Sequence, residues 1–210
     1  MAGSASDQAA GLAIGITGGI ACGKSTVGEI LQAAGLKVLD TDKVAHEVMA
    51  AGTDVHRAVL TAFGEAILAS NGEVDRKKLG ARVFGAPDQL AELNRIVHPA
   101  VGQAWRQWMV EQVRTGQDVA VLIPLLFEVG AVEGWDAIIV VAAPEAQVLA
   151  RLASRGLSED QARARIASQW SQEEKIKRTD FVIMNDGSMI DLERNTLQTL
   201  QDIQRKRRHS

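Results

Sequence analysis

The sequence has one cysteine, no excess of positive charge and no long apolar run. Because Cys22 is the one cysteine among 210 residues, an internal disulfide is excluded, and no Cys/His spacing is typical of structural zinc. The 23 basic and 26 acidic residues give a net charge of −3, which disfavours a protein built mainly to bind nucleic acid. No apolar run reaches the roughly 18 residues that cross a bilayer. We therefore expect a cytoplasmic protein without a membrane partner.

The remaining composition is that of an ordinary globular protein. Apolar residues make up 46% and charged residues 23% of the chain, a balance that excludes a wholly disordered or collagen-like protein. We expect residues 1–11, rich in Ala, Ser, Gly and Gln, to form a flexible tail. A single domain follows over 12–204, and 205–210 form a basic tail.

Short apolar runs that end at glycine, proline or aspartate predict buried strands. They lie at 12–17, 37–39, 119–123, 137–141 and 181–184. Helical spacing of apolar residues predicts helices over 25–34, 145–154, 159–168 and 190–205. Because strand, glycine-rich loop, helix and strand follow one another, the chain is expected to form an α/β fold with a parallel sheet.

Residues 43–113 read as mostly helical and are expected to form an insert on the substrate side. Breaks between its helices are predicted near 52–53, 71–72, 85–87 and His98-Pro99. His98 is interpreted either as a ligand contact or, more simply, as part of a helix end.

Residues 18–25, Gly-Gly-Ile-Ala-Cys-Gly-Lys-Ser, match the phosphate-loop pattern G-x-x-x-x-G-K-[ST] at every fixed position. Gly18 and Gly23 allow backbone torsions that turn successive N–H groups toward phosphate oxygens, and the following helix points its positive end at the same anion. Lys24 supplies a charge for the β- and γ-phosphates, and the Ser25 hydroxyl can ligate Mg²⁺. The loop predicts ATP or GTP binding but does not name the phosphoryl acceptor. Because Cys22 lies near a helix N-terminus and Lys24, its thiolate form is expected to be favoured. A simpler interpretation is that Cys22 is a loop residue without a functional role.

Asp40-Thr41-Asp42 stands at the carboxyl end of the second predicted strand, where ligands of open α/β sheets bind. A carboxylate there can accept the proton of an attacking hydroxyl. An aspartate at that position can instead cap the helix that follows or assist a metal ion. The sequence leaves open which aspartate takes which role.

Basic residues follow the fourth predicted strand. Arg151 and Arg155 lie four apart on one helical face, and Arg163, Arg165 and Lys175 come later. Mobile cations on a helical lid over 145–178 can cover a transferring phosphate, while the alternative is a solvated basic face. The run of cations at 205–208 can contact RNA or, more simply, complement a helix C-terminus.

Taken together, the motifs resemble those of the dephospho-CoA kinase family over about residues 13–200. The matching segments, in family order, are Thr17-Gly18-Gly19-Ile20 with Lys24-Ser25-Thr26, D-T-D-K-V-A at 40–45, G-E-V-D-R at 72–76, L-N-R-I-V-H-P at 93–99, P-L-L-F-E at 124–128, R-A-R-I at 163–166 with Gln169, and D-F-V-I at 180–183 with Asn185 and Gly187.

The resemblance implies a P-loop NTPase-like three-layer α/β/α fold with a five-stranded parallel sheet, a helical substrate-binding insert and a lid helix. It implies transfer of phosphate from ATP, with Mg²⁺, to the ribose 3′-hydroxyl of dephospho-CoA. Family catalytic positions correspond to Lys24, Asp42 and Arg151. ATP-binding positions correspond to Gly19, Ile20, Ala21, Cys22, Gly23, Lys24, Ser25, Thr26, Arg155, Asn185 and Gly187, substrate-binding positions to Asp42, His98, Leu125 and Leu126, and the metal position to Ser25.

The chain departs from the family pattern in the loop at Ala21-Cys22, at Leu122, where many members carry an acid, and around Trp170. Two other functions remain open from the sequence: a P-loop kinase for another small acceptor, and a nucleotide-gated RNA-binding protein. The sequence does not indicate an oligomeric state.

Overall fold

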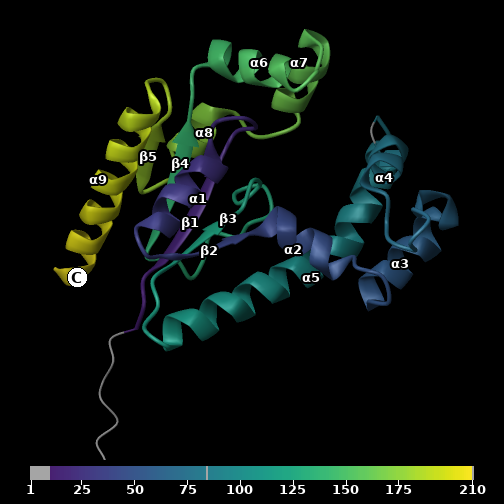
Figure 1. Cartoon of the computed structure of the whole chain (residues 1–210), viewed down its shortest axis with the longest axis horizontal. Helices are drawn as coiled ribbons and strands as arrows, with labels where there is room; N and C mark the ends of the chain where they lie inside the picture. Colours follow the sequence, from purple (N-terminus) through teal and green to yellow (C-terminus); the bar gives the residue numbers. More distant parts are fainter. Residues whose placement is uncertain (1–9, 84, 210) are drawn as a thin grey trace, which may run out of the picture. The chain divides into compact units, whose positions relative to one another are not determined.

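A computed structural model describes residues 10–83 and 85–209 of the chain, which divides into two compact units (Figure 1). Of the described residues, unit 1 comprises those up to Leu39 and from Met109 onward, and unit 2 comprises those within Asp40–Trp108. The first contains the sheet and the second is helical.

Unit 1 is built on a five-stranded sheet with the order β2-β3-β1-β4-β5. The strands are β1 (Ala13–Gly18), β2 (Lys37–Asp40), β3 (Val119–Leu122), β4 (Ala137–Ala142) and β5 (Phe181–Met184). The pairings of β1 with β3 and β4, and of β4 with β5, are parallel. All five predicted strands are present, with bounds shifted by at most a residue, and the α/β fold with a parallel sheet is confirmed.

The central strands are buried on both faces, as their nearly continuous apolar sequences require. Helices α1 (Lys24–Ala33) and α9 (Met189–Arg208) pack against each other, and α9 also packs against β5. Val27, Leu31, Leu192 and Ile203 join this core. Burial of apolar surface, worth about 25 cal/mol per Å², holds these layers together.

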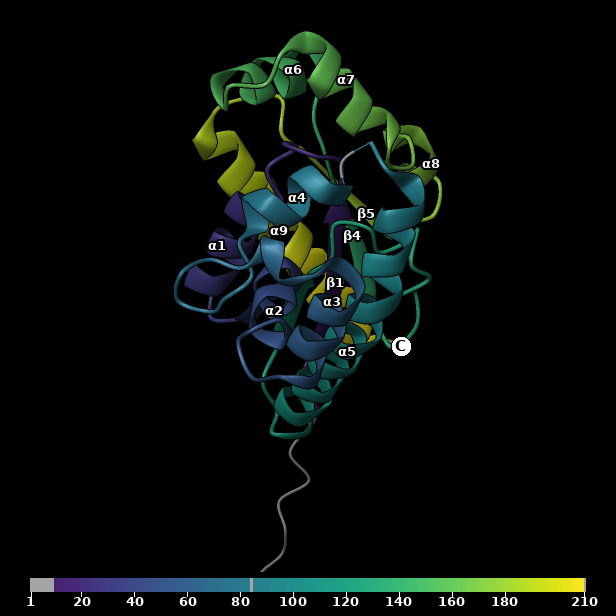
Figure 2. The ribbon, with the colours of Figure 1, turned by 90° about the vertical axis from the view of Figure 1, so that its right-hand side faces the viewer.

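Three further helices of unit 1 lie beyond the carboxyl ends of the strands. They are α6 (Glu145–Ser154), α7 (Glu159–Ala167) and α8 (Gln172–Ile176). Figure 2 shows α6, α7 and α8 in succession over the end of the unit that carries the loop after β1. Helices α6 and α7 match the prediction closely, whereas α8 was not predicted, although Ser171 caps it through the Glu174 amide.

Unit 2 has its own apolar core. Its helices are α2 (Thr41–Val48), α3 (Asp54–Phe63), the 3₁₀ turn η1 (Glu65–Ile67), α4 (Arg76–Val83) and the part of α5 (Pro87–Arg114) up to Trp108. Val59, Phe63, Leu79 and Val97 are buried together within it. The predicted helical character and the breaks at 52–53, 71–72 and 85–87 are confirmed.

The predicted break at His98-Pro99 is wrong, because α5 continues through Pro99 to Arg114. Proline in a helix removes one backbone hydrogen bond and costs about 3 kcal/mol. In a 28-residue helix, buried Val97 and Trp105 on either side of the proline hold the helix in place. His98 therefore lies within a helix and not at its end.

The predicted C-terminal helix is longer than expected and includes the basic run. Helix α9 ends at Arg208, and its last turns form ion pairs with residues that directly precede β4 and β5. Lys206 Nζ lies 3.8 Å from Asp180 Oδ1 and Arg207 Nε lies 3.7 Å from Asp136 Oδ1. The cations of the basic run, Arg205, Lys206, Arg207 and Arg208, all stand in the last turn of α9. Within the described part of the chain, no helix is both long and apolar enough to cross a membrane.

Candidate active site

The loop between β1 and α1 has the backbone of an anion-binding turn. Gly23 has a φ of 104°, and an added Cβ would stand 2.2 Å from Asn185 Nδ2. At Gly18 an added Cβ would stand 2.2 Å from the Val141 carbonyl oxygen. Both fixed glycines are therefore required by conformation and by space. Ala21 has a φ of 58°, a left-handed conformation that costs about 1 kcal/mol in a residue with a side chain.

Lys24 and Ser25 occupy the start of α1, as the motif predicts. Lys24 Nζ donates to the carbonyl oxygens of Gly18 at 2.9 Å and Gly19 at 2.8 Å, so the ammonium lies over the loop. Ser25 is exposed in the first turn. No acidic residue stands in that turn, so no side-chain charge there cancels the positive end of the helix dipole. The arrangement attracts an anion.

Three polar side chains from distant parts of unit 1 hold the loop backbone. Asn185 Nδ2 donates to the Cys22 carbonyl at 2.8 Å, and Arg151 Nη1 donates to the Ala21 carbonyl at 3.1 Å. Gln169 Oε1 accepts a hydrogen bond from the Ile20 amide at 3.1 Å. Because these bonds engage successive backbone groups, they fix the shape of the turn before any ligand contributes.

The Cys22 side chain is only 2% exposed, and its Sγ lies 3.6 Å from Gln172 Oε1. Burial raises the pKa of the Cys22 thiol and outweighs the opposing charge of Lys24. The expectation that the thiolate form of Cys22 is favoured is therefore wrong, because desolvation of the charged form has a larger effect than the positive charge of Lys24. Cys22 packs as a small apolar residue within the loop.

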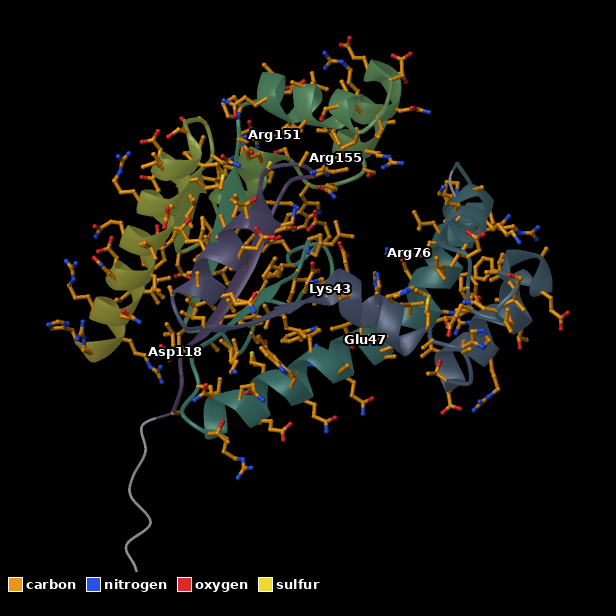
Figure 3. The ribbon with its side chains drawn as sticks, in the orientation of Figure 1. Lys43, Glu47, Arg76, Asp118, Arg151 and Arg155 are labelled. Carbon is orange, nitrogen blue, oxygen red and sulfur yellow. The ribbon has the colours of Figure 1, made fainter. Side chains whose placement is uncertain are left out.

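The two arginines expected on one face of the lid helix have different surroundings. Arg151, on α6, bonds the loop and also Gln147 Oε1 at 3.0 Å, whereas Arg155, the C-cap of α6, is exposed. Figure 3 labels both on the side of α6 that is nearer the loop after β1. Arg163 pairs with Glu145 and Glu159 at the surface.

Lys175 is not a mobile lid cation. Its side chain is 0% exposed and forms an ion pair with Glu128 Oε1 at 2.8 Å. The sequence pattern placed this residue among exposed cations because α8 was not predicted. A cap signal was present, since Ser171 is followed three residues later by Glu174.

The two aspartates at the junction of β2 and α2, which belong to unit 2, have different surroundings. Asp40 is the N-cap of α2, and its Oδ1 accepts a hydrogen bond from the Asp42 amide at 2.9 Å. Asp42 stands in the first turn of α2 with an exposed side chain. The helix-capping role, which the sequence left open, therefore falls to Asp40.

The residues expected on the substrate side are placed unequally. His98 is exposed on α5, and partial desolvation lowers its pKa. Leu125 is half-buried, but Leu126 is 0% exposed. Leu126 lies against β1, where it would meet a Cβ added at Gly15 at 3.1 Å. The Leu126 side chain belongs to the core, so the expected contact of this residue with substrate stays a prediction. Gly187 is exposed in the loop between β5 and α9.

The end of β3 carries no acid, as the sequence indicates. Leu122 is buried and lies 3.0 Å from the position of a Cβ added at Gly28 of α1. In the parts of the chain that the structure describes, no group of three or more His, Cys, Asp or Glu side chains is arranged to hold a metal ion. A metal ion at this edge would take most of its ligands from phosphate and water.

A parallel sheet whose first strand leads through a glycine-rich loop into a lysine-bearing helix is typical of P-loop nucleotide-binding proteins. The family model for dephospho-CoA kinase matches residues 12–191. The chain is 46% identical over 191 residues to a dephospho-CoA kinase of Geobacillus kaustophilus, covering 90% of this chain and 95% of that one. It is 43% identical over 183 residues to a dephospho-CoA kinase of Geobacter sulfurreducens, covering 86% and 93%. The chain belongs to the dephospho-CoA kinase family.

Solved structures agree with this assignment. The crystal structure of TT1252 from Thermus thermophilus matches with a TM-score of 0.74 at 37% identity, covering 92% of this chain and 98% of that one. Dephospho-CoA kinase from Campylobacter jejuni matches with a TM-score of 0.63 at 30% identity, covering 91% and 96%. The resemblance predicted from the motifs is confirmed.

Proposed function

We propose that the protein transfers the γ-phosphoryl group of ATP to the ribose 3′-hydroxyl of dephospho-CoA, producing coenzyme A and ADP. The observation that carries this proposal is the pre-shaped loop 18–25 in a chain of the dephospho-CoA kinase family. The hydroxyl oxygen attacks the γ-phosphorus, the bond to the β–γ bridging oxygen breaks, and ADP leaves with that oxygen. This is the final step of coenzyme A synthesis, which we expect to occur in the cytoplasm.

On the ATP side, the loop residues 19–26, the positive end of α1 and Lys24 are proposed to supply the positive environment. Lys24 lies 2.8 and 2.9 Å from loop carbonyls, and the same ammonium can turn to the transferring phosphate. Arg151 is bonded to the loop through the Ala21 carbonyl, and we propose that it neutralises the charge that spreads over the phosphoryl oxygens. Arg155, Asn185 and Gly187 are proposed to border the nucleotide.

On the acceptor side, Asp42 is proposed as the base that takes the 3′-hydroxyl proton. Its side chain is exposed while Asp40 is committed to the helix cap, so the two carboxylates are not interchangeable. A positioned base of this kind contributes about 10²–10⁴ in rate. His98 and Leu125 are proposed to border dephospho-CoA, and Leu126 would contribute only through its backbone.

The residues fit Mg²⁺ bound mainly by substrate. The Ser25 hydroxyl is a hard oxygen donor that is exposed at the start of α1. Mg²⁺ keeps several waters and takes few protein ligands beside phosphate oxygens, so one hydroxyl is sufficient. The ion would neutralise charge on the β- and γ-phosphates when bound. Asp40 and Asp42 remain candidates for assisting it through water.

The experiment measures ADP release from Mg-ATP with and without dephospho-CoA, and identifies coenzyme A by mass. Matching amounts of ADP and coenzyme A that depend on dephospho-CoA are expected. ATP binding without that product would overturn the proposal. Adenosine, nucleoside monophosphates and shikimate serve as alternative acceptors, and each should react far more slowly.

A further inference from the structure

Unit 1 contains a fully buried lysine that the proposed chemistry does not use. The Lys175 side chain is 0% exposed, and its Nζ lies 2.8 Å from Glu128 Oε1 and 3.3 Å from the Pro124 carbonyl oxygen. Glu128 is 14% exposed. Moving both charges out of water carries a desolvation cost that only close, directed contacts offset.

Through this ion pair and the Pro124 carbonyl, Lys175 connects α8 to the segment after β3 and to the end of β1. The Pro124 carbonyl accepts from Lys175 and also from Thr17 Oγ1 at 3.1 Å, and Thr17 directly precedes the first glycine of the phosphate loop. Glu128 Oε1 also accepts from the Trp170 amide at 3.0 Å. The Lys175 ammonium therefore fixes the C-terminal side of the lid relative to the strand that carries the loop.

Neighbouring residues of the segment 169–175, which we call the α8 segment, reach the other loops at this edge. Gln169 accepts from the Ile20 amide after β1, and Gln172 Oε1 accepts from the Ala143 amide after β4 at 2.9 Å. The Trp170 ring stacks on Phe127 at 6.3 Å between centroids, with Arg178 5.0 Å from the Trp170 ring centroid. One short segment is thus bonded to the connections after β1, β3 and β4.

Within the described residues, the Glu128 carboxylate depends on this lysine. Glu128 Oε2 is a buried side-chain atom that makes no hydrogen bond, so Lys175 and the Trp170 amide, both at Oε1, are the partners that offset the buried charge. Removing the ammonium would leave the carboxylate buried without a cation, and the Pro124 carbonyl would keep only Thr17.

We propose that Lys175 is a positioning residue for phosphoryl transfer: through Glu128 and Pro124 it fixes the α8 segment as the stationary end of the α6–α7 lid. The proposal rests on the proposed function. Helices α6 and α7 form the expected lid, and α6 carries Arg151. The α8 segment stays bonded to the connections after β1, β3 and β4. With Lys175 in place, the Gln169 side chain holds the phosphate loop at the Ile20 amide, and the lid closes in a single position. Without it, the lid closes loosely and water competes with the acceptor for the γ-phosphoryl group.

The test measures the amount of coenzyme A formed per ADP released, together with kcat, for Lys175→Met. This ratio reports how well the site excludes water, and loss of stability alone does not change it when the enzyme is assayed well below its melting temperature. We expect kcat to fall at least about tenfold and the ratio to fall clearly below that of the wild type. Lys37→Met, an exposed lysine at the opposite edge of the sheet, is the matched control and should keep both values.

A second variant covers the case in which Lys175→Met does not fold. Gln169→Ala leaves the buried pair intact and removes the contact to Ile20, and it should lower the ratio in the same direction. Gln198→Ala, an exposed glutamine on α9, is its control. If the folded variants lose melting temperature but keep kcat and the wild-type ratio, the ion pair is only structural and the proposal is overturned.

Failure of the proposed function can be distinguished from failure of the inference about Lys175. If the wild-type protein makes no coenzyme A, the acceptor assignment fails. The inference about Lys175 is then tested by the fluorescence change of Trp170 when a non-hydrolysable ATP analogue binds, with Trp170→Phe identifying its share of the signal. A change that persists unaltered in Lys175→Met would overturn the positioning role, and a lost or shifted change would support it.

Discussion

The loop after β1 and the segment after β2 contribute to the proposed reaction in different ways. Around the first, Asn185, Arg151 and Gln169 bond successive backbone groups, so the shape of the loop is set by contacts from residues far away in the sequence. In the second, Asp40 caps the helix and presents Asp42 in its first turn, so a local signal suffices. Substitutions around the loop are therefore expected to act through geometry, whereas substitution of Asp42 is expected to act on the chemical step.

The largest expected effect is at Lys24, which contacts the loop and is proposed to supply charge for the transferring phosphate. Lys24→Ala should lower kcat about 10³-fold, because a preorganised charge on the transferring phosphate is lost. Coenzyme A formation at saturating ATP and dephospho-CoA is the measurement, with Lys37→Ala as a control that should react normally. Near-normal turnover would remove the assignment of the phosphate loop.

Asp42→Asn should affect the rate and leave ATP binding nearly unchanged. Loss of a positioned base lowers kcat by about 10²–10⁴, while the loop contacts that hold ATP remain intact. Single-turnover transfer and ATP-analogue titration measure the two quantities. Asp54→Asn, in the first turn of α3, is a control expected to retain activity. A loss confined to ATP affinity would make Asp42 a metal or structural residue.

Asn185→Ala should have the opposite pattern, with weaker ATP binding and lower stability. The buried Cys22 carbonyl loses its side-chain donor, which costs about 1–3 kcal/mol. Asn185→Asp should be worse, because a carboxylate oxygen would then face that carbonyl. Denaturant unfolding and ATP titration measure both effects. Wild-type affinity in both variants would show that the loop keeps its shape without this bond.

The thiol of Cys22 tests whether the loop is as closely held as the contacts indicate. Burial raises the pKa of Cys22, so less thiolate is present near neutral pH than in a free cysteine, and its reactivity should increase with pH. Alkylation by iodoacetamide should be at least about tenfold slower in the native protein than in denaturant. Native alkylation at the rate of a free thiol would mean that the loop opens readily.

The smallest expected effect lies at the start of α9, away from both segments. Ser188→Ala removes the N-cap and should cost about 1 kcal/mol with unchanged kcat. Hydrogen bonds from Ser188 also lower the pKa of Asp191. A carboxyl group whose pKa is lowered on folding stabilises the folded state at pH values above its unfolded pKa, and this stabilisation is lost as the pH falls through the folded pKa. The difference in stability between Ser188→Ala and the wild type should therefore shrink below about pH 4. Thermal melts across pH measure it, and an equal difference at every pH would contradict the account.

Much of the fold could be predicted because its signals are local. Apolar runs that end at Gly18, Asp40 or Asn185 predict strands, and the order of elements implies a parallel sheet. Pro99 misled the prediction because buried neighbours on α5 outweigh one missing hydrogen bond. Helix α8 was missed because five residues are too few for a periodic pattern.

The phosphate loop and the family can be recognised from the sequence alone, because each is carried by neighbouring residues at fixed spacing. The burial of Lys175 against Glu128, the place of Leu126 in the core and the raised pKa of the Cys22 thiol emerge from the folded chain. Those properties depend on desolvation and on contacts between distant segments. Neither can be read from residue type and spacing, since the same lysine is a surface cation or a buried partner according to what packs around it.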